Sequence, residues 1–162
     1  MQIIFLPRSA TILLVFILWP VIQATITFIC HKIDDRYFSY ESWFFKPFTW
    51  EKNGDVYKRL LMVDKWKKFM PDGAAVVKGG FKMRHLDFSN YDNLKKFLVV
   101  SCRGEFAHWL SILPFWIFGF FTPPIVILYM LIYSLAANLP CIIVQRYNRP
   151  RVARLLQKQA CQ

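Results

Sequence analysis

The residues with the clearest capacity for chemistry stand at the start of a long apolar stretch. The stretch runs to about Val144, and the side chains that open it are Arg103, Glu105, His108 and Trp109. Ionisable groups beside sequence of this kind are costly to bury, and they more often contact a substrate or a lipid head group than serve as packing. The cluster therefore indicates a site without specifying its reaction.

Glu105 and His108 are three residues apart, which places them near one face of a helix. A carboxylate that orients an imidazole forms a proton-transfer unit, suited to drawing a proton from a hydroxyl group that attacks an acyl group. The same spacing occurs in carboxylate-bridged metal sites, but these need a second such motif. The sequence has none, so no metal site is predicted. A purely interfacial helix end is the alternative interpretation.

A second polar segment closes the apolar stretch, with three guanidinium groups in seven residues: Gln145-Arg146-Tyr147-Asn148-Arg149-Pro150-Arg151. Guanidinium groups bind phosphate through paired hydrogen bonds. The segment therefore predicts a binding site for a coenzyme A tail, a lipid phosphate or a sugar phosphate, through Arg146, Arg149, Arg151, Tyr147 and Asn148. A basic patch that only stops translocation is the alternative.

Other polar positions could join this site. Arg84 and His85 alternate with apolar residues, as in a strand or an interfacial loop, and His85 is a candidate second base or a solvated surface residue. Asn138 lies late in the last apolar segment, where it either lines the site or serves helix packing. The H-x-x-x-x-D motif of glycerolipid acyltransferases is absent, because Asn90 follows His85 where Asp is required.

Composition limits the environment of the chain. Its 162 residues are 56% hydrophobic and 19% charged, and a soluble domain of this size cannot cover so much apolar surface. The net charge of +11 suits anionic lipid or a phosphorylated small molecule, and nucleic acid is not expected beside membrane-spanning sequence. The four cysteines are scattered, so neither a disulfide framework nor a zinc site is predicted.

Three apolar segments define the expected architecture. Residues 10–30 carry no charge and are long enough to span a bilayer as a helix, with a signal peptide as the alternative. Residues 106–121 and 124–144 flank a glycine and proline turn signal and predict a helical hairpin. The fold is thus expected to be mostly α, a small integral membrane protein with one N-terminal transmembrane helix, a polar interfacial section and this hairpin, as a single domain 1–162.

The polar parts of the chain indicate its orientation. Residues 31–105 interleave aromatic and basic side chains, which suits the head-group layer. The tail 145–162 holds five Lys or Arg residues and no acid, which predicts that it is cytoplasmic. Three helices are few to enclose a reaction, so a homo-oligomer is a candidate state.

Longer strings resemble the glycosyl-4,4'-diaponeurosporenoate acyltransferase family. They are Asp35-Arg36-Tyr37-Phe38, Lys65-Trp66-Lys67, Arg84-His85-Leu86, Arg103-Gly104-Glu105-Phe106-Ala107-His108-Trp109-Leu110-Ser111-Ile112-Leu113-Pro114, Asn138-Leu139-Pro140 and the segment from Gln145 to Arg151. The resemblance covers nearly the whole chain in the same order. It implies the last step of staphyloxanthin-type carotenoid synthesis in bacteria, the transfer of a long-chain acyl group to a primary hydroxyl of the glucose on a glucosylated carotenoid ester.

The combined prediction is a membrane O-acyltransferase of the bacterial cell membrane that needs no cofactor. Its expected partners are a lipid-soluble glycosylated carotenoid, an acyl donor such as acyl-CoA, and membrane lipid. We expect His108 to be the general base and Glu105 to orient it. Arg103 or Arg84 would stabilise the oxyanion, and Trp109 would line the site.

Two further functions remain open on sequence alone. One is a non-catalytic membrane subunit that docks or orients lipid or carotenoid enzymes. The other is a transferase that uses the arginines for a pyrophosphate, although the paired acids that would hold its metal are missing. Within the acyltransferase prediction, direct attack is favoured over a covalent acyl-enzyme, and Ser101 and Cys102 keep that step open.

Overall fold

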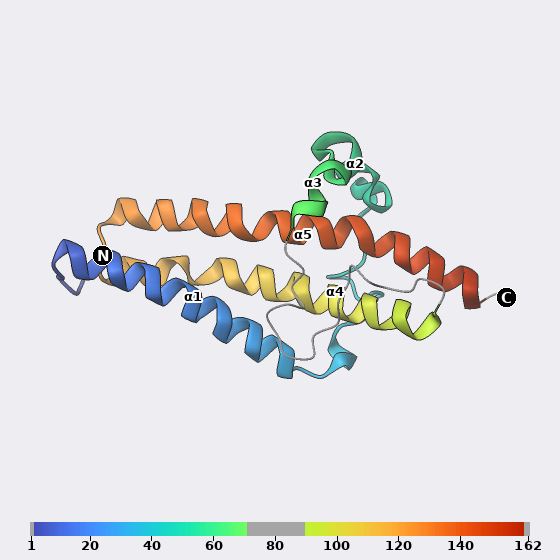
Figure 1. Ribbon diagram of the computed structural model, residues 1–162, viewed down its shortest axis with the longest axis horizontal. Helices are drawn as coiled ribbons and strands as arrows, with labels where there is room; N and C mark the ends of the chain where they lie inside the picture. The colour runs from blue at the N-terminus through green and yellow to red at the C-terminus, as the bar shows by residue number, and fades with distance from the viewer. Residues whose placement is uncertain (1, 71–89, 161–162) are drawn as a thin grey trace. The chain divides into compact units, whose positions relative to one another are not determined.

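The computed structural model describes residues 2–70 and 90–160, and every regular element in these ranges is helical (Figure 1). The long helices are α1 (Arg8–Lys32), α4 (Tyr91–Ile112) and α5 (Pro124–Ala160), and the short ones are α2 (Asp55–Leu61) and α3 (Val63–Trp66). Short 3-10 turns complete them: η1 (Asp35–Tyr37), η2 (Thr49–Gly54), η3 (Lys67–Phe69) and η6 (Leu113–Phe120). The prediction of a mostly α fold is confirmed for these residues.

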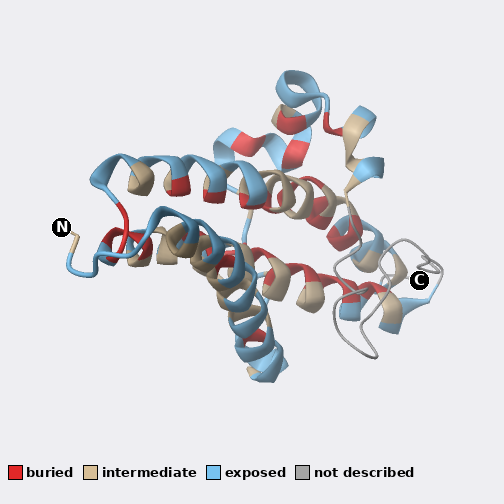
Figure 2. Cartoon of the chain, turned by 60° about the vertical axis from the view of Figure 1, so that its left-hand side comes forward, coloured by how far each residue is buried: buried red, intermediate tan, exposed pale blue. Residues whose placement is uncertain are grey.

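Two of the helices, α1 and α5, are long and apolar enough to cross a membrane by length and composition. Along α1 and the first half of α5 most residues are exposed or half-buried (Figure 2). The exposed side chains include large apolar ones, such as Ile12, Phe16 and Phe28. Within α1 the hydroxyls of Thr25 and Thr27 donate to carbonyl groups four residues earlier, so they present no unsatisfied polar group.

Contacts among the described residues divide the chain into two compact units. Unit 1 comprises residues 1–33 and 106–140, and unit 2 comprises residues 34–105 and 141–162. Each of α4 and α5 contributes residues to both units. The prediction of one domain over residues 1–162 stays a prediction.

Unit 1 is built around an aromatic core. Trp19 of α1 lies 5.7 Å from the ring of Phe118 and 5.3 Å from the ring of Tyr133. Gln23 of α1 also donates to the carbonyl of Ser111, at 3.0 Å. These contacts join α1 to the helical hairpin at apolar and polar positions alike.

The two arms of the hairpin differ from each other. The first arm is α-helical only to Ile112 and continues as the 3-10 helix η6, whose second residue is Pro114. Proline lacks the N–H that an α-helical turn would need there, which accounts for the change. The second arm begins at Pro124, as predicted, but α5 continues past Val144 to Ala160.

Apolar side chains gather in two clusters among the described residues of unit 2. In the first, Leu94, Phe97 and Leu98 of α4 pack on Val152 and Ala153 of α5. Asn90 caps this part of α4, since its side chain accepts from the backbone N–H of residues 92 and 93 at 2.9 and 3.3 Å.

The second cluster in unit 2 consists of Tyr57, Val63 and Tyr147. It attaches α2 and α3 to the part of α5 that carries the Gln145–Arg151 segment. The short helices are therefore held by the same residues that the sequence marks as a candidate site.

Candidate active site

A buried network of two glutamates and two arginines lies inside unit 2. Arg146 donates through Nε to Oε1 of Glu105 at 2.6 Å and through Nη1 to Oε1 of Glu51 at 2.9 Å. Nη2 of Arg149 lies 2.6 Å from Oε2 of Glu105. All four side chains are buried. Two positive and two negative charges balance, which is the condition under which ion pairs can remain away from water.

The remaining guanidinium N–H groups also meet acceptors of the chain itself. Arg146 donates to the carbonyl of Phe44 at 2.8 Å, and Arg149 donates to the carbonyl of Phe45 at 3.0 Å. Arg149 further donates to the hydroxyl and the carbonyl of Ser101, each at 3.1 Å. A donor phosphate would have to displace these internal acceptors. The role of Arg146 and Arg149 in holding phosphate therefore stays a prediction, and their observed contacts hold α4, α5 and residues 44–51 together.

Glu51 is a member of this network that the sequence did not single out. Its Oε2 accepts from the backbone N–H of Phe48 at 2.7 Å, and its Oε1 accepts from the hydroxyl of Tyr57. Burial and the hydrogen bond to Glu51 raise the pKa of Tyr57. The only local signal is a glutamate three residues after Phe48 at the start of a helical turn, because the partner Arg146 lies far away in sequence.

Ser101 and Cys102 are fully buried, which bears on covalent catalysis. The hydroxyl of Ser101 donates to Oε1 of Gln145 at 2.8 Å. Burial raises the pKa of the Cys102 thiol to about 11, so the reactive thiolate is disfavoured. This arrangement supports direct attack rather than an acyl-enzyme at either residue.

The more exposed predicted arginines in unit 2 pair with aspartates. Arg103 pairs with Asp35 and lies over the ring of Phe38, 5.0 Å from its centroid. Arg151 lies 3.2 Å from Asp55, and its guanidinium is 3.7 Å from the centroid of the Tyr147 ring. Arg151 keeps 29% of its side chain exposed, so among the arginines of the Gln145–Arg151 segment it is the one that a ligand phosphate can reach most readily.

The other predicted positions of that segment differ in exposure. Tyr147 is buried, and its hydroxyl donates to Asp64. Asn148 is half-buried, while Trp109 on α4, in unit 1, is exposed. Arg84 and His85 lie outside the described residues, so their roles as oxyanion donor and second base remain predictions.

The candidate base His108 lies in unit 1 and is paired with an asparagine. Nδ1 of His108 is 2.9 Å from Oδ1 of Asn138, and Nδ2 of Asn138 donates to the carbonyl of Ser134 at 2.9 Å. The second bond fixes which amide atom faces the histidine, because only the NH₂ group can donate to a carbonyl. Oδ1 is an acceptor, so Nδ1 must carry the proton and Nε2 of the neutral ring has the free lone pair.

Glu105 has contacts that its sequence spacing did not indicate, and its expected role in orienting His108 stays a prediction. Both of its carboxylate oxygens face guanidinium groups of unit 2, and the group at Nδ1 of His108 is Asn138. The sequence analysis offered Asn138 as a lining residue of the site or as a helix-packing residue. Its spacing of 30 residues from His108 carried no signal for a pair, because the hairpin alone brings the two together.

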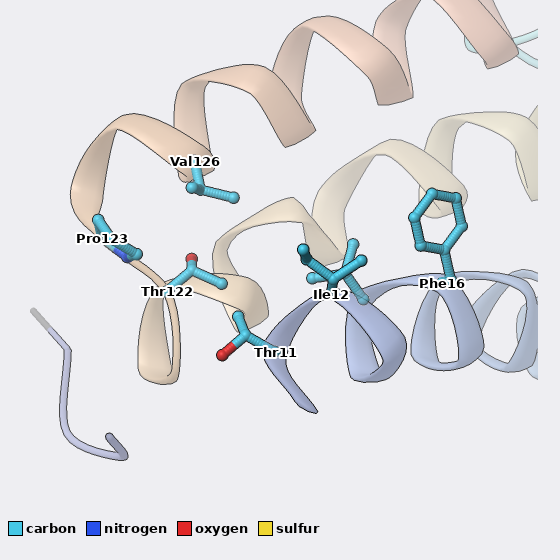
Figure 3. Close-up of a pocket in the computed structure, with 7 residues that line it drawn as sticks. Thr11, Ile12, Phe16, Thr122, Pro123 and Val126 are labelled. Carbon is cyan, nitrogen blue, oxygen red and sulfur yellow. The ribbon is translucent and has the colours of Figure 1, made fainter. Parts of the chain in front are cut away.

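An apolar pocket of about 210 Å³ lies in unit 1, between the start of α1 and the start of α5 (Figure 3). Its lining residues are Thr11, Ile12, Val15, Phe16, Thr122, Pro123 and Val126. The hydroxyl of Thr122 donates to the carbonyl of Phe118 at 2.7 Å, and that of Thr11 to the carbonyl of Pro7 at 3.1 Å. The pocket therefore offers apolar contacts suited to part of a hydrocarbon chain.

Comparison with known proteins assigns the chain to a family. The model of the glycosyl-4,4'-diaponeurosporenoate acyltransferase family matches residues 41–158. The chain belongs to this family. The acyltransferase of that name from Staphylococcus aureus strain MRSA252 is 39% identical over 140 residues, which cover 86% of this chain and 84% of the relative. Those of strains bovine RF122 and USA300 are 38% identical over the same shares. No solved structure matches the chain.

Membership in this acyltransferase family confirms the resemblance drawn from the sequence. The matched region includes the network of unit 2 and the His108–Asn138 pair of unit 1. The two groups thus lie in the part of the chain that the family shares.

Proposed function

We propose that the chain is a membrane O-acyltransferase that transfers a long-chain acyl group to a sugar hydroxyl of a glycosylated carotenoid. The observation that carries this proposal is the family match over residues 41–158, because the relatives are named for an acyl transfer to a glycosylated diaponeurosporenoate. The His108–Asn138 pair supplies the chemistry that such a transfer needs.

His108 acts as the general base through Nε2. The sugar hydroxyl attacks the carbonyl carbon of the acyl donor as Nε2 takes its proton, and a tetrahedral oxyanion forms. Collapse of this intermediate breaks the bond to the leaving group, which receives the proton back from the imidazolium. Oδ1 of Asn138 accepts from Nδ1–H throughout, and this bond strengthens when the ring becomes charged. Asn138 is thus a positioning residue.

The donor's phosphates bind at the exposed edge of the Gln145–Arg151 segment. Arg151 is the accessible guanidinium there, and Asn148, three residues earlier, is half-buried. Arg146 and Arg149 anchor the same segment of α5 through ion pairs with the buried Glu51 and Glu105. Arg103 is the described candidate for an oxyanion donor, and acyl-CoA is the donor whose phosphates would suit this surface.

Membrane placement follows from the two long apolar helices. The exposed apolar side chains of α1 and of the first half of α5 favour an apolar solvent, which supports the proposal that these segments span the bacterial cell membrane. The basic residues after Val144 favour a cytoplasmic location for that end, where acyl-CoA is available. The acceptor's polyene packs against these helices from within the bilayer, and a homo-oligomer would enclose it further.

The test uses the full-length protein in lipid nanodiscs with glucosylated carotenoid extract and long-chain acyl-CoA, and it follows the product mass. A gain of one acyl chain that is lost in His108→Ala supports the proposal. His31→Ala is the matched control, because His31 is an exposed histidine of α1 and has no assigned role. If the parent chain and His108→Ala both add an acyl chain to the acceptor, the protein is an acyltransferase but His108 is not its base. If the folded protein adds no acyl chain from acyl-CoA, from a phospholipid or from a carrier-protein donor, the result would favour a docking subunit.

A further inference from the structure

An exposed apolar tip in unit 2 takes no part in the network or in the His108–Asn138 pair. Leu60, Leu61 and Met62 are consecutive and are exposed by 75%, 45% and 53%. Leu60 and Leu61 end α2, and Met62 lies between α2 and α3, in the region that Figure 1 draws in green. Single exposed apolar residues need no explanation, but three in a row at one turn indicate a contact surface.

The tip is held in a defined conformation. Met62 has a positive φ of 47°, which is unusual for a residue with a side chain. The indole N–H of Trp66 donates to the carbonyl of Leu61 at 2.7 Å and fixes the turn from its far side. Tyr57, three residues before the tip, and Val63, directly after it, are buried against Tyr147 of α5. The chain therefore buries the base of the turn and keeps its apolar end outward.

Basic residues flank the tip on both sides. Between residues 58 and 69 the sequence holds one acid, Asp64, and five cations: Lys58, Arg59, Lys65, Lys67 and Lys68. Asp64 lies 3.8 Å from Lys58 and 3.5 Å from Lys67, and it also accepts from the hydroxyl of Tyr147. The one negative charge of this segment therefore interacts with Lys58, Lys67 and Tyr147, and the residues around the apolar side chains carry a net positive charge. Phe69, at the end of the segment, is 78% exposed.

We propose that the Leu60–Met62 tip inserts into the interface of an anionic bilayer, with the flanking cations on lipid phosphates. Aliphatic side chains between cations are the arrangement that interfacial segments use, because long basic side chains keep their charge at the head groups while the apolar residues enter the acyl boundary. A protein partner would need a much broader surface than one turn offers. This membrane contact is additional to the spanning helices and does not depend on the acyl transfer.

The proposal is tested with full-length protein in nanodiscs of phosphatidylglycerol or of phosphatidylcholine. An environment-sensitive fluorescent amino acid is placed at Leu61, with Leu60 as a second position if the first variant does not fold. Gln157 is the control position, since it is an exposed polar residue of α5. Quenching by lipids with brominated acyl chains is then measured at each position.

We expect several times stronger quenching at position 61 than at position 157, with a larger difference in phosphatidylglycerol. The double variant Arg59→Gln, Lys65→Gln should lose the preference for anionic lipid. The control double variant Lys95→Gln, Lys96→Gln on α4 removes the same charge and should keep the preference for anionic lipid. Equal quenching at positions 61 and 157 overturns the proposal. A probe at 61 that stays in water with lipid and responds only to an acidic acyl carrier protein also overturns it, in favour of a protein surface.

Discussion

Glu105 and Arg149 form an ion pair in which Nη2 lies 2.6 Å from Oε2 and neither side chain is exposed by more than 1%. Arg146 occupies the other oxygen of the same carboxylate. Glu105 thus neutralises charge from two arginines at once. Removing the glutamate would leave that buried charge without its counterion, whereas a group that only oriented a base could be replaced at little cost in stability.

Glu105→Gln is accordingly expected to destabilise unit 2, by about 3–5 kcal/mol. The measurement is thermal unfolding of the full-length protein in detergent, followed by circular dichroism, with activity measured at a temperature where the variant stays folded. Glu105→Gln, Arg149→Gln is the compensating control, because it removes one charge of each sign and should recover part of the loss. If Glu105→Gln unfolds at the same temperature as the parent chain but loses activity, Glu105 has the catalytic role that its sequence spacing indicated.

The His108–Asn138 pair makes a prediction about rate rather than stability. Asn138→Ala should lower kcat by about 10–100-fold and change KM little, because the base loses its orientation but the substrates keep their contacts. His108→Ala should lower kcat by about 10²–10⁴-fold. Asn138→Asp, which keeps an acceptor at Nδ1, should retain more activity than Asn138→Ala. Equal losses in the alanine and aspartate variants would show that Asn138 serves packing only.

The sequence predicted the elements better than the partners. Runs of apolar residues marked α1 and the first part of α5, since residues 10–30 and 124–144 carry no charge. The end of α5 could not be read in this way, because a switch from apolar to basic residues marks a change of solvent and not the end of a helix. The helix continues to Ala160 although the apolar run ends at Val144.

Spacing also gave no sign of the long-range partners of two candidate residues. The three-residue interval between Glu105 and His108 is a local relationship, and it suggested that one side chain orients the other. In the structure Glu105 pairs with Arg146, 41 residues away, and with Arg149, and His108 pairs with Asn138, 30 residues away. Such pairs depend on how α4 and α5 face each other within each unit, which no local pattern contains.

A third prediction concerns the backbone at Met62. Its φ of 47° lies in the left-handed region, which costs a residue with a side chain about 1–2 kcal/mol. Met62→Gly should therefore stabilise the fold by about 0.5–1 kcal/mol, after allowance for the greater freedom of glycine when unfolded. The control is Leu61→Gly, which places glycine inside helix α2 and should destabilise it. Chemical unfolding of both variants measures the difference, and a loss of stability in Met62→Gly would contradict the prediction.

The lowered pKa of Asp64 leads to a prediction about how stability depends on pH. The hydrogen bond from Tyr147 is the largest cause that lowers the pKa of Asp64, and Lys67 and Lys58 lower it further. A carboxyl group whose pKa is lower in the folded state stabilises the fold above its unfolded pKa of about 3.9. This stability is lost as the pH falls through the folded pKa. The protein should therefore lose stability on acidification below about pH 4, in part through this group.

Tyr147→Phe isolates that contribution, because it removes the hydrogen bond and leaves the ring packed on Tyr57 and Val63. The variant should unfold more easily near neutral pH and show a shallower dependence of stability on pH in the acid range. Tyr37→Phe is the matched control, since Tyr37 is an exposed tyrosine of unit 2 whose hydroxyl accepts from Arg36. The measurement is the thermal unfolding temperature of the parent chain and the two variants across the acid pH range. An acid profile for Tyr147→Phe that parallels those of the parent chain and of Tyr37→Phe would mean that the bond between Tyr147 and Asp64 does not contribute to acid sensitivity.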